Sequence, residues 1–285
     1  MIAPPFIGRV FGAAGDQRVG ILNPNSGQSP WRATLWTPTG VVDLHPAAAA
    51  LGSFAYAVAG LQQVGDAALA PSVTHAALWH QSAASFVDLN PIGVEDSFAR
   101  ATDGVRQGGW TQASGGVVRA ALWSGSAASH ISLHPSVGTT SAIHGMAPGE
   151  QVGYVNYSGI GNHAALWRGS AASYVDLNPP GAAISVLNGT CGVAQVGYAN
   201  LGGVNGAGVW FGTAESFLSL HQFLPAGYFS SVATSVAVEN GTLYVGGYAS
   251  TGFQQEAFLW TGPIPAPGTL GVLLGAGLLA CRRRR

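Results

Sequence analysis

Residues 163–179 read HAALWRGSAASYVDLNP, and near copies of this stretch recur along the 285-residue chain. Each copy places a tryptophan at the same position of the repeat: Trp36, Trp79, Trp123, Trp167, Trp210 and Trp260. Consecutive tryptophans are 43, 44, 44, 43 and 50 residues apart. A period of this size predicts six copies of one structural unit.

A second motif, Gln151 to Tyr154 (QVGY), precedes this stretch and also recurs along the chain. Each copy then contains four short apolar runs separated by Gly, Ser, Asn and Pro; in the fourth copy they are residues 141–146, 151–155, 163–167 and 174–177. Runs of this length between turn formers predict strands, and four strands in about 44 residues are typical of one β-propeller blade. We therefore predict an all-β, six-bladed β-propeller of four-stranded blades over residues 1–262, with the six tryptophans buried at equivalent places.

The two ends of the repeat region depart from this pattern. The longer last interval predicts an insertion between Phe217 and Ser235. No fourth strand is apparent after Trp260, whereas residues 1–5 align with the end of one. Either the N-terminal residues close the sixth blade poorly, or the gene begins upstream and also encodes a signal peptide that Met1 to Phe6 lack. In the second case, which we favour, the sixth blade has three strands and a bare edge at Glu256–Trp260.

Composition excludes several classes of protein. Only 8% of the residues are charged and 47% are hydrophobic, which argues against a disordered chain or a coiled coil. All 11 basic residues are arginines, and four of them end the chain, so that the body carries more acidic than basic residues. That balance argues against a nucleic-acid partner. The two cysteines cannot form a disulfide framework, and no Cys/His cluster predicts a zinc site.

Candidate catalytic groups occur at repeat positions that favour structural roles. His45, His134 and His221 alternate with Asn90 and Asn178 after the fourth strand, and we interpret all five as turn-capping residues. Asp43, Asp88 and Asp176 share a position suited to hydrogen bonding with a turn. Glu95, Asp96, Arg100 and Asp103 form the only local charge cluster, which we expect to be a solvated loop. The sequence therefore predicts no catalytic, cofactor-binding or metal-ligating residue.

The tail after Gly262 differs from the repeats. A proline-rich segment precedes residues 269–281, which are 13 uncharged residues, and Arg282, Arg283, Arg284 and Arg285 end the chain. As a helix, 13 residues span about 20 Å of a hydrocarbon core about 30 Å thick. We predict a short C-terminal transmembrane helix whose terminal arginines stay on the cytoplasmic side, so that the propeller lies outside.

Two resemblances extend this interpretation. Over roughly residues 9–261 the chain resembles the HAF-type extracellular repeats of bacterial surface and secreted proteins, whose hallmark is a His-Ala-(aromatic or Leu)-Leu-Trp strand after a Val-Gly strand. The third position is usually Ala here (Ala77, Ala121, Ala165), and Phe258 comes closest to the hallmark. Residues 263–285 are similar to the PEP-CTERM sorting signal, also catalogued as the ice-binding protein C-terminal domain, with Pro265, Ala266 and Pro267 standing where that family has Pro-Glu-Pro. This resemblance implies an exosortase-like processing enzyme, transient anchoring in the inner membrane, and release to the cell surface or extracellular matrix. A permanent membrane anchor is the alternative.

Two functional hypotheses follow. The first is a non-enzymatic, exported propeller that needs no cofactor and acts as a binding or structural module of the cell surface or extracellular matrix, with extracellular polysaccharide as a partner. The second is a secreted propeller hydrolase or lyase that acts on polysaccharide. A channel lined by unlike, non-repeating charged residues favours the enzyme, whereas a channel lined by repeated Ala, Ser and Gly favours the module.

Overall fold

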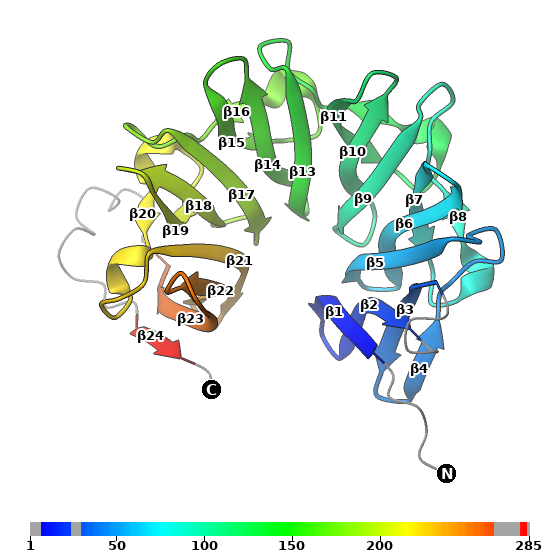
Figure 1. Ribbon diagram of the computed structural model, residues 1–285, viewed down its shortest axis with the longest axis horizontal. Coiled ribbons are helices and arrows are strands. Elements are labelled where there is room, and N and C mark those ends of the chain that lie inside the picture. Colours follow the sequence, from blue (N-terminus) through cyan, green and yellow to red (C-terminus); the bar gives the residue numbers. More distant parts are fainter. Residues whose placement is uncertain (1–6, 24–29, 265–279, 284–285) are drawn as a thin grey trace. The chain divides into compact units, whose positions relative to one another are not determined.

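Antiparallel four-stranded sheets follow one another along the computed structural model, which describes residues 7–23, 30–264 and 280–283 (Figure 1). There are six such sheets in the described part of the chain, and each pairs its strands in chain order. These sheets confirm the predicted all-β, six-bladed β-propeller. We call them blades one to six.

The chain divides into two compact units, and the boundary falls within strand β13. The first unit comprises residues 1–134 with 140–143, and the second comprises residues 135–139 with 144–285. Blades one to three belong to the first unit and consist of β1 (Ile7–Ala14), β2 (Gln17–Asn23), β3 (Arg32–Thr37), β4 (Gly40–Asp43); β5 (Gly52–Ala59), β6 (Gln62–Ala70), β7 (Val73–Trp79), β8 (Val87–Asp88); β9 (Asp96–Thr102), β10 (Gln107–Ala113), β11 (Val117–Trp123) and β12 (Ile131–Ser132).

Most of the second unit repeats this arrangement. Blades four to six consist of β13 (Thr140–Ala147), β14 (Glu150–Tyr157), β15 (Gly161–Trp167), β16 (Val175–Asp176); β17 (Ile184–Thr190), β18 (Gln195–Leu201), β19 (Val204–Trp210), β20 (Leu218–Ser219); β21 (Ser230–Glu239), β22 (Thr242–Ser250), β23 (Gln255–Pro263) and β24 (Ala280–Arg283). Short 3₁₀ turns follow the third strand of blades two to five and, in one case, a fourth strand: η1 (Ala83–Ser85), η2 (Ala127–Ser129), η3 (Ala171–Ser173), η4 (Ala214–Ser216) and η5 (His221–Phe223).

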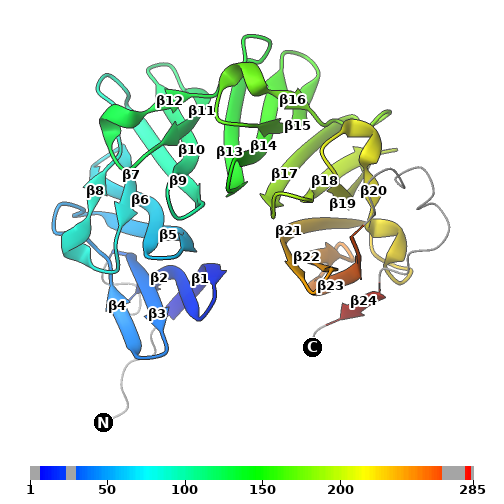
Figure 2. The same ribbon diagram turned by 180° about the vertical axis from the view of Figure 1, so that it is seen from behind.

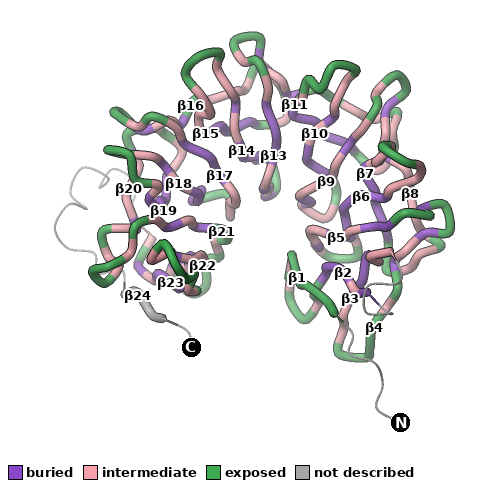
Figure 3. The backbone as a smooth tube through the Cα atoms, in the orientation of Figure 1, coloured by how far each residue is buried: buried purple, intermediate pink, exposed green. Residues whose placement is uncertain are grey.

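The repeated tryptophans anchor the packing of one blade on the next. Trp79, Trp123, Trp167, Trp210 and Trp260 are fully buried. Trp79 packs with Val19 and Leu35 of blade one, and Trp210 packs with Val152 and Leu166 of blade four. Burying an aromatic side chain of this size contributes on the order of 2–3 kcal/mol. The buried stretches along the strands are visible in Figure 3.

Trp36 differs from the other five tryptophans, because it is only half-buried. The prediction that all six occupy equally buried places is therefore wrong for Trp36. Ala33 and Leu35 alternate with it along β3 and face Trp79, so Trp36 lies on the opposite face of blade one. No other blade of the first unit packs on that face.

A glycine of the second strand is required by a bulge in the first strand. The pairing of β5 with β6 shifts register between Ala55 and Ala57, opposite Gly65. A Cβ atom built on Gly65 would lie 1.7 Å from the carbonyl oxygen of Phe54. Equivalent clashes, at 1.8 to 2.2 Å from the first-strand carbonyl, meet a Cβ on Gly20, Gly109, Gly197 and Gly247. The glycine of the Val-Gly motif is thus a position of close backbone approach.

The insertion predicted between Phe217 and Ser235 is only part of the longer last interval. His221 and Ser231 are bonded across ten positions, whereas the equivalent His134 and Ser141 are seven apart, and η5 occupies the extra length. The remainder lengthens β21 and β22 to 10 and 9 residues, compared with 7 each in β17 and β18. The extra residues are therefore divided between a connection and a hairpin.

The sixth blade has four strands, which corrects the expectation of three strands and a bare edge. Its fourth strand, β24, comes from the C-terminal tail and pairs with β23 from Phe258 to Thr261. Residues 265–279, which contain most of the predicted transmembrane helix, lie outside the described residues. No helix in the described ranges is long and apolar enough to span a membrane.

Substituting Gly65 by alanine tests the role of the bulge. We expect Gly65→Ala to lower the free energy of unfolding by about 1–3 kcal/mol, because its methyl group collides with backbone. Gly189→Ala is the matched control, since its Cβ would meet no atom closer than 3.3 Å. Thermal melts of the two variants should separate clearly, and equal melting temperatures would contradict the assignment.

Candidate binding site on the first strands of blades one to three

The first strands of blades one to three, β1, β5 and β9, lie side by side along one side of the first unit (Figure 1, and from behind in Figure 2). The bulge in each adds one residue without a pairing partner: Phe11 in β1, Tyr56 in β5 and Arg100 in β9. The corresponding residues of β17 and β21 are Asn188 and Thr234. The bulge therefore presents a different side chain in each blade.

These three residues contact one another across the blades. The ring centroids of Phe11 and Tyr56 are 5.4 Å apart. The Arg100 guanidinium carbon lies 3.8 Å from the centre of the Tyr56 ring and 4.8 Å from that of Trp110, so it is stacked between blades two and three. Cation–π contacts of this kind contribute about 0.5–2 kcal/mol each, depending on how far the cation is desolvated.

A buried carboxyl group lies beneath this stack. Asp66 on β6 is 5% exposed and occupies the motif position where four of the other copies have an aromatic residue, Trp110, Tyr154, Tyr198 and Tyr248, and blade one has Ile21. Its carboxyl group forms a hydrogen bond with Tyr56 and interacts with the charge of Arg100. Burial raises the pKa of Asp66 to about 6, although Arg100 and Tyr56 both act to lower it. Burial and the neighbouring Asp66 charge also raise the pKa of Tyr56 above its usual value.

We call Phe11, Tyr56, Asp66, Arg100 and Trp110 the aromatic–arginine patch. Phe11 is 41% exposed, and Tyr56, Arg100 and Trp110 are half-buried. The patch thus offers ring faces and a guanidinium group to solvent, while the acid that holds them is buried. Tyr, Trp, Phe and Arg are the residue types that are enriched in binding surfaces.

Sequence reasoning placed Arg100 in a different cluster. We expected Glu95, Asp96, Arg100 and Asp103 to share one solvated loop. Instead Asp96 accepts the Thr74 amide at 2.7 Å, and Asp103 pairs with Arg106 and accepts its amide at 2.6 Å. Arg100 points to blade two because it is the bulge residue. The signal that could have revealed the patch is the Asp at position 66, where the repeat calls for an aromatic residue.

The repeated histidines and asparagines contribute to the contacts between consecutive blades. In blades one to five, the third strand donates an amide N–H to a first-strand serine of the next blade, at 2.8–2.9 Å, as Ala33 does to Ser53. His45, His134 and His221 bond the same serine hydroxyls through Nδ1 at 2.8–2.9 Å. Burial lowers the pKa of His45 and of His221, so a neutral ring that accepts the hydroxyl proton is favoured.

The turn-capping prediction therefore holds for part of this set. Asn90 and Asn178 donate to the carbonyls of Val94 and Ala182 and close turns as expected. The three histidines bond the serine of the next blade instead, which corrects our interpretation of them. Asp43, Asp88 and Asp176 accept the amide two residues further on, as predicted.

The predicted sorting residues are described only in part. Arg282 and Arg283 belong to β24. Pro265, Ala266, Pro267, Arg284 and Arg285 lie outside the described residues. In the described ranges, no three His, Cys, Asp or Glu side chains are grouped so that they could hold a metal ion.

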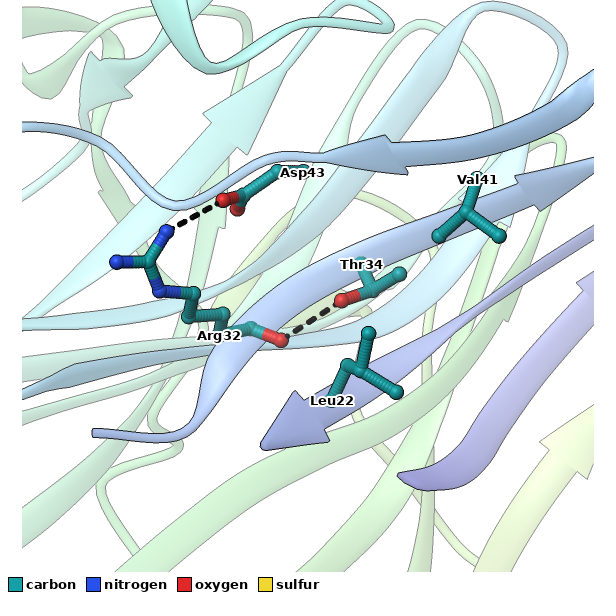
Figure 4. Close-up of a pocket in the computed structure, with 5 residues that line it drawn as sticks. All are labelled: Leu22, Arg32, Thr34, Val41 and Asp43. Carbon is teal, nitrogen blue, oxygen red and sulfur yellow. Dashed lines mark hydrogen bonds and ion pairs between the residues drawn. The ribbon is translucent and has the colours of Figure 1, made fainter. Parts of the chain in front are cut away.

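A small pocket of about 150 Å³ lies on blade one, between Leu22, Arg32, Thr34, Val41 and Asp43 (Figure 4). Arg32 and Asp43 form an ion pair of 2.7 Å at its edge, and both are exposed by 40% or more. The pocket is on the same face as Trp36, the face that no other blade of the first unit covers. We interpret it as a hollow of the blade surface rather than as a built site.

Comparison with known proteins supports the fold and no closer relationship. No family model matches the chain, and no curated protein matches it significantly. A solved puromycin hydrolase matches with a TM-score of 0.59 at 11% identity, over 99% of this chain and 46% of that protein. A prolyl endopeptidase gives 0.56 at 8% identity, over 98% and 49%. The β-propeller domain of the Trilobed protease from Pyrococcus furiosus, described as having an open velcro topology, gives 0.54 at 9% identity, over 93% and 85%.

These similarities define the class of protein, a β-propeller. The chain spans about half the length of the puromycin hydrolase and of the prolyl endopeptidase. At these identities the similarity shows the fold alone.

The raised pKa of Asp66 predicts a pH dependence of stability. Because the folded-state pKa of about 6 exceeds the unfolded value near 3.8, the folded state binds more protons between these values. Stability should therefore rise as the pH falls from about 6 to 4, by up to about 3 kcal/mol from this group. Asp66→Asn should remove that contribution.

Denaturant unfolding at pH 4.5 and pH 7 measures this effect. The matched control is Asp16→Asn, which removes the same charge from an exposed turn. We expect the stability difference between the two pH values to change in Asp66→Asn and to stay as in the wild type in Asp16→Asn. An unchanged pH dependence in Asp66→Asn would contradict the burial of an ionisable carboxyl group there.

Proposed function

We propose that this chain is a non-enzymatic, exported β-propeller that acts as a binding module of the cell surface or extracellular matrix. The observation that carries the proposal is the aromatic–arginine patch, where the bulge residues of three adjacent blades contact one another above Asp66, an acid at a motif position that is otherwise aromatic or aliphatic. If these residues only filled space, apolar side chains would do so at less cost, because burying the carboxyl group of Asp66 under the guanidinium of Arg100 is unfavourable. We infer that the acid orients Arg100 and Tyr56 for a ligand.

An extracellular polysaccharide is the ligand that we propose for the patch. The C–H faces of sugar rings pack against half-exposed aromatic rings such as Phe11, and sugar hydroxyls accept from a guanidinium and exchange hydrogen bonds with a phenol. The patch extends across three adjacent first strands. It therefore suits several consecutive units of a sugar chain better than a single small molecule.

A substitution series tests the binding proposal. Arg100→Ala and Tyr56→Phe should each weaken binding to a polysaccharide isolated from the producing cells by roughly tenfold or more, as expected of residues at the centre of an interface. Arg119→Ala is the matched control, because it removes an exposed arginine from the same blade. Affinity electrophoresis measures the effect. Equal retardation of Arg100→Ala, Arg119→Ala and the wild type would reject the patch as the ligand site.

The polysaccharide hydrolase or lyase remains the alternative, and Asp66 is the observation in its favour. A carboxyl group with a pKa near 6 is suited to general acid chemistry. It is also paired with Arg100 and Tyr56, which suits a positioning role. Release of reducing or unsaturated ends from the same polysaccharide, abolished in Asp66→Asn, would establish the enzyme and reject the module.

We further propose that residues 263–285 act as the sorting signal, processed by an exosortase-like enzyme after transient anchoring in the inner membrane. What supports this is the order of the tail: Pro265 to Pro267, 13 uncharged residues, and Arg282 to Arg285. The terminal arginines stay on the cytoplasmic side because moving them across the bilayer is costly.

Intact-mass measurement on the exported protein tests the sorting proposal. We expect a product that has lost everything after residues 265–268, whereas a mass that includes Arg285 indicates a permanent anchor. Replacing Arg282 to Arg285 with serine should disturb orientation or retention. Export and location that do not respond to this replacement would show that the tail is no signal.

A further inference from the structure

The fourth strand of blade six has an origin unlike that of the other blades. In blade four, β16 follows β15 closely, and Val175 and Asp176 pair with Leu166 and Ala165. In blade six, β23 continues past Trp260 to Pro263, and the next 16 residues, 264–279, separate it from β24. β24 pairs with Phe258 and Leu259, the equivalent positions, and also with Trp260 and Thr261. A non-local segment therefore occupies the edge that a local strand occupies elsewhere.

This edge needs a partner for physical reasons. An uncovered strand exposes a row of unpaired N–H and C=O groups and readily pairs with other chains. Phe258 is 4% exposed and Trp260 is fully buried, so the middle of β23 is well packed and can present a fixed ladder to an incoming strand. Backbone pairing gives such docking its affinity largely without regard to side chains.

The length of the connection is compatible with exchange. Sixteen residues can span about 50 Å when fully extended, whereas a hairpin strand is joined to its neighbour by as few as two residues. Ala280 and Cys281 are also the end of the uncharged tail segment. They cannot pair with β23 while that segment spans a membrane.

We propose that the edge of β23 is an exchangeable docking site for the C-terminal tail strand, and that docking there withholds the tail from the membrane. The occupant is residues 280–283 of the same chain, held by backbone pairing. The second part of this inference rests on the tail being the sorting signal. The docking of the tail strand does not rest on that role, and it is tested without a membrane.

A tail peptide supplied in trans provides the test. The probe is a fluorescent peptide of residues 277–285, with Cys281 replaced by serine, and its anisotropy is measured against a chain that ends at Ile264. We expect saturable binding to the truncated chain and at least tenfold weaker binding to the full chain, whose edge is occupied. A peptide with proline at position 281 keeps every arginine but cannot donate to the ladder, and it should not bind.

A second variant covers the case in which the truncated chain does not fold. The full chain carrying Cys281→Pro keeps all residues of the tail but disrupts its strand, and it should bind the peptide as the truncated chain does. If the peptides with proline and with serine at position 281 bound equally, charge alone would account for the binding and the proposal would be overturned. The proposal would also be overturned if the wild-type full chain, the chain ending at Ile264 and the Cys281→Pro chain all bound the peptide equally. It would likewise be overturned if the truncated chain formed a dimer that the peptide does not dissociate. A mass result against processing would leave these outcomes unaffected.

Discussion

A buried hydrogen bond between consecutive blades is the constraint on which much of this structure depends. In blades one to five, the third strand carries an alanine whose buried amide donates to a serine hydroxyl of the next blade. Leaving a buried amide unsatisfied costs about 1–3 kcal/mol, so each of these hydrogen bonds fixes the third strand of one blade against the first strand of the next. Histidine or asparagine at the end of the fourth strand then bonds the same hydroxyl in four of the five cases. The polar groups set the register and the tryptophans supply the apolar area.

The same repetition makes exceptions informative. Where blades differ without consequence, as between histidine and asparagine after the fourth strand, the substituted residue still reaches the same serine or closes the same turn. Asp66 and Arg100 are different, because each would be unfavourable alone: Asp66 replaces an apolar or aromatic residue of the repeat, and Arg100 occupies a bulge position that varies from blade to blade. A lone buried carboxylate or a lone guanidinium between rings would be penalised by desolvation, whereas the two together compensate each other in part. Their pairing is the physical basis for proposing a binding site there.

The sixth blade shows how one tail sequence can serve two environments. Its small and apolar residues suit a membrane segment, and its backbone suits any open edge of a sheet, because strand pairing uses groups that every residue carries. The competition that we propose between these two states is a property of the whole chain, since neither the repeats nor the tail contains it alone.

The sequence by itself determined the repeat, the four strands per blade and the burial of five of the six tryptophans, because a 44-residue period and short runs between turn formers are local information. It also indicated that Asp43, Asp88 and Asp176 serve turns, since their partners lie two residues away. Only the tertiary structure decided the partners of His45, His134 and His221, the exposure of Trp36 and the position of Arg100. The serine partners of the histidines lie only seven to ten positions further along the chain, but they belong to the next blade. The exposure of Trp36 depends on which blade face is covered, and the position of Arg100 depends on where a bulge turns its side chain towards Tyr56, 44 positions away. For the same reason, the fourth strand of blade six could not be read from the residues that follow Trp260.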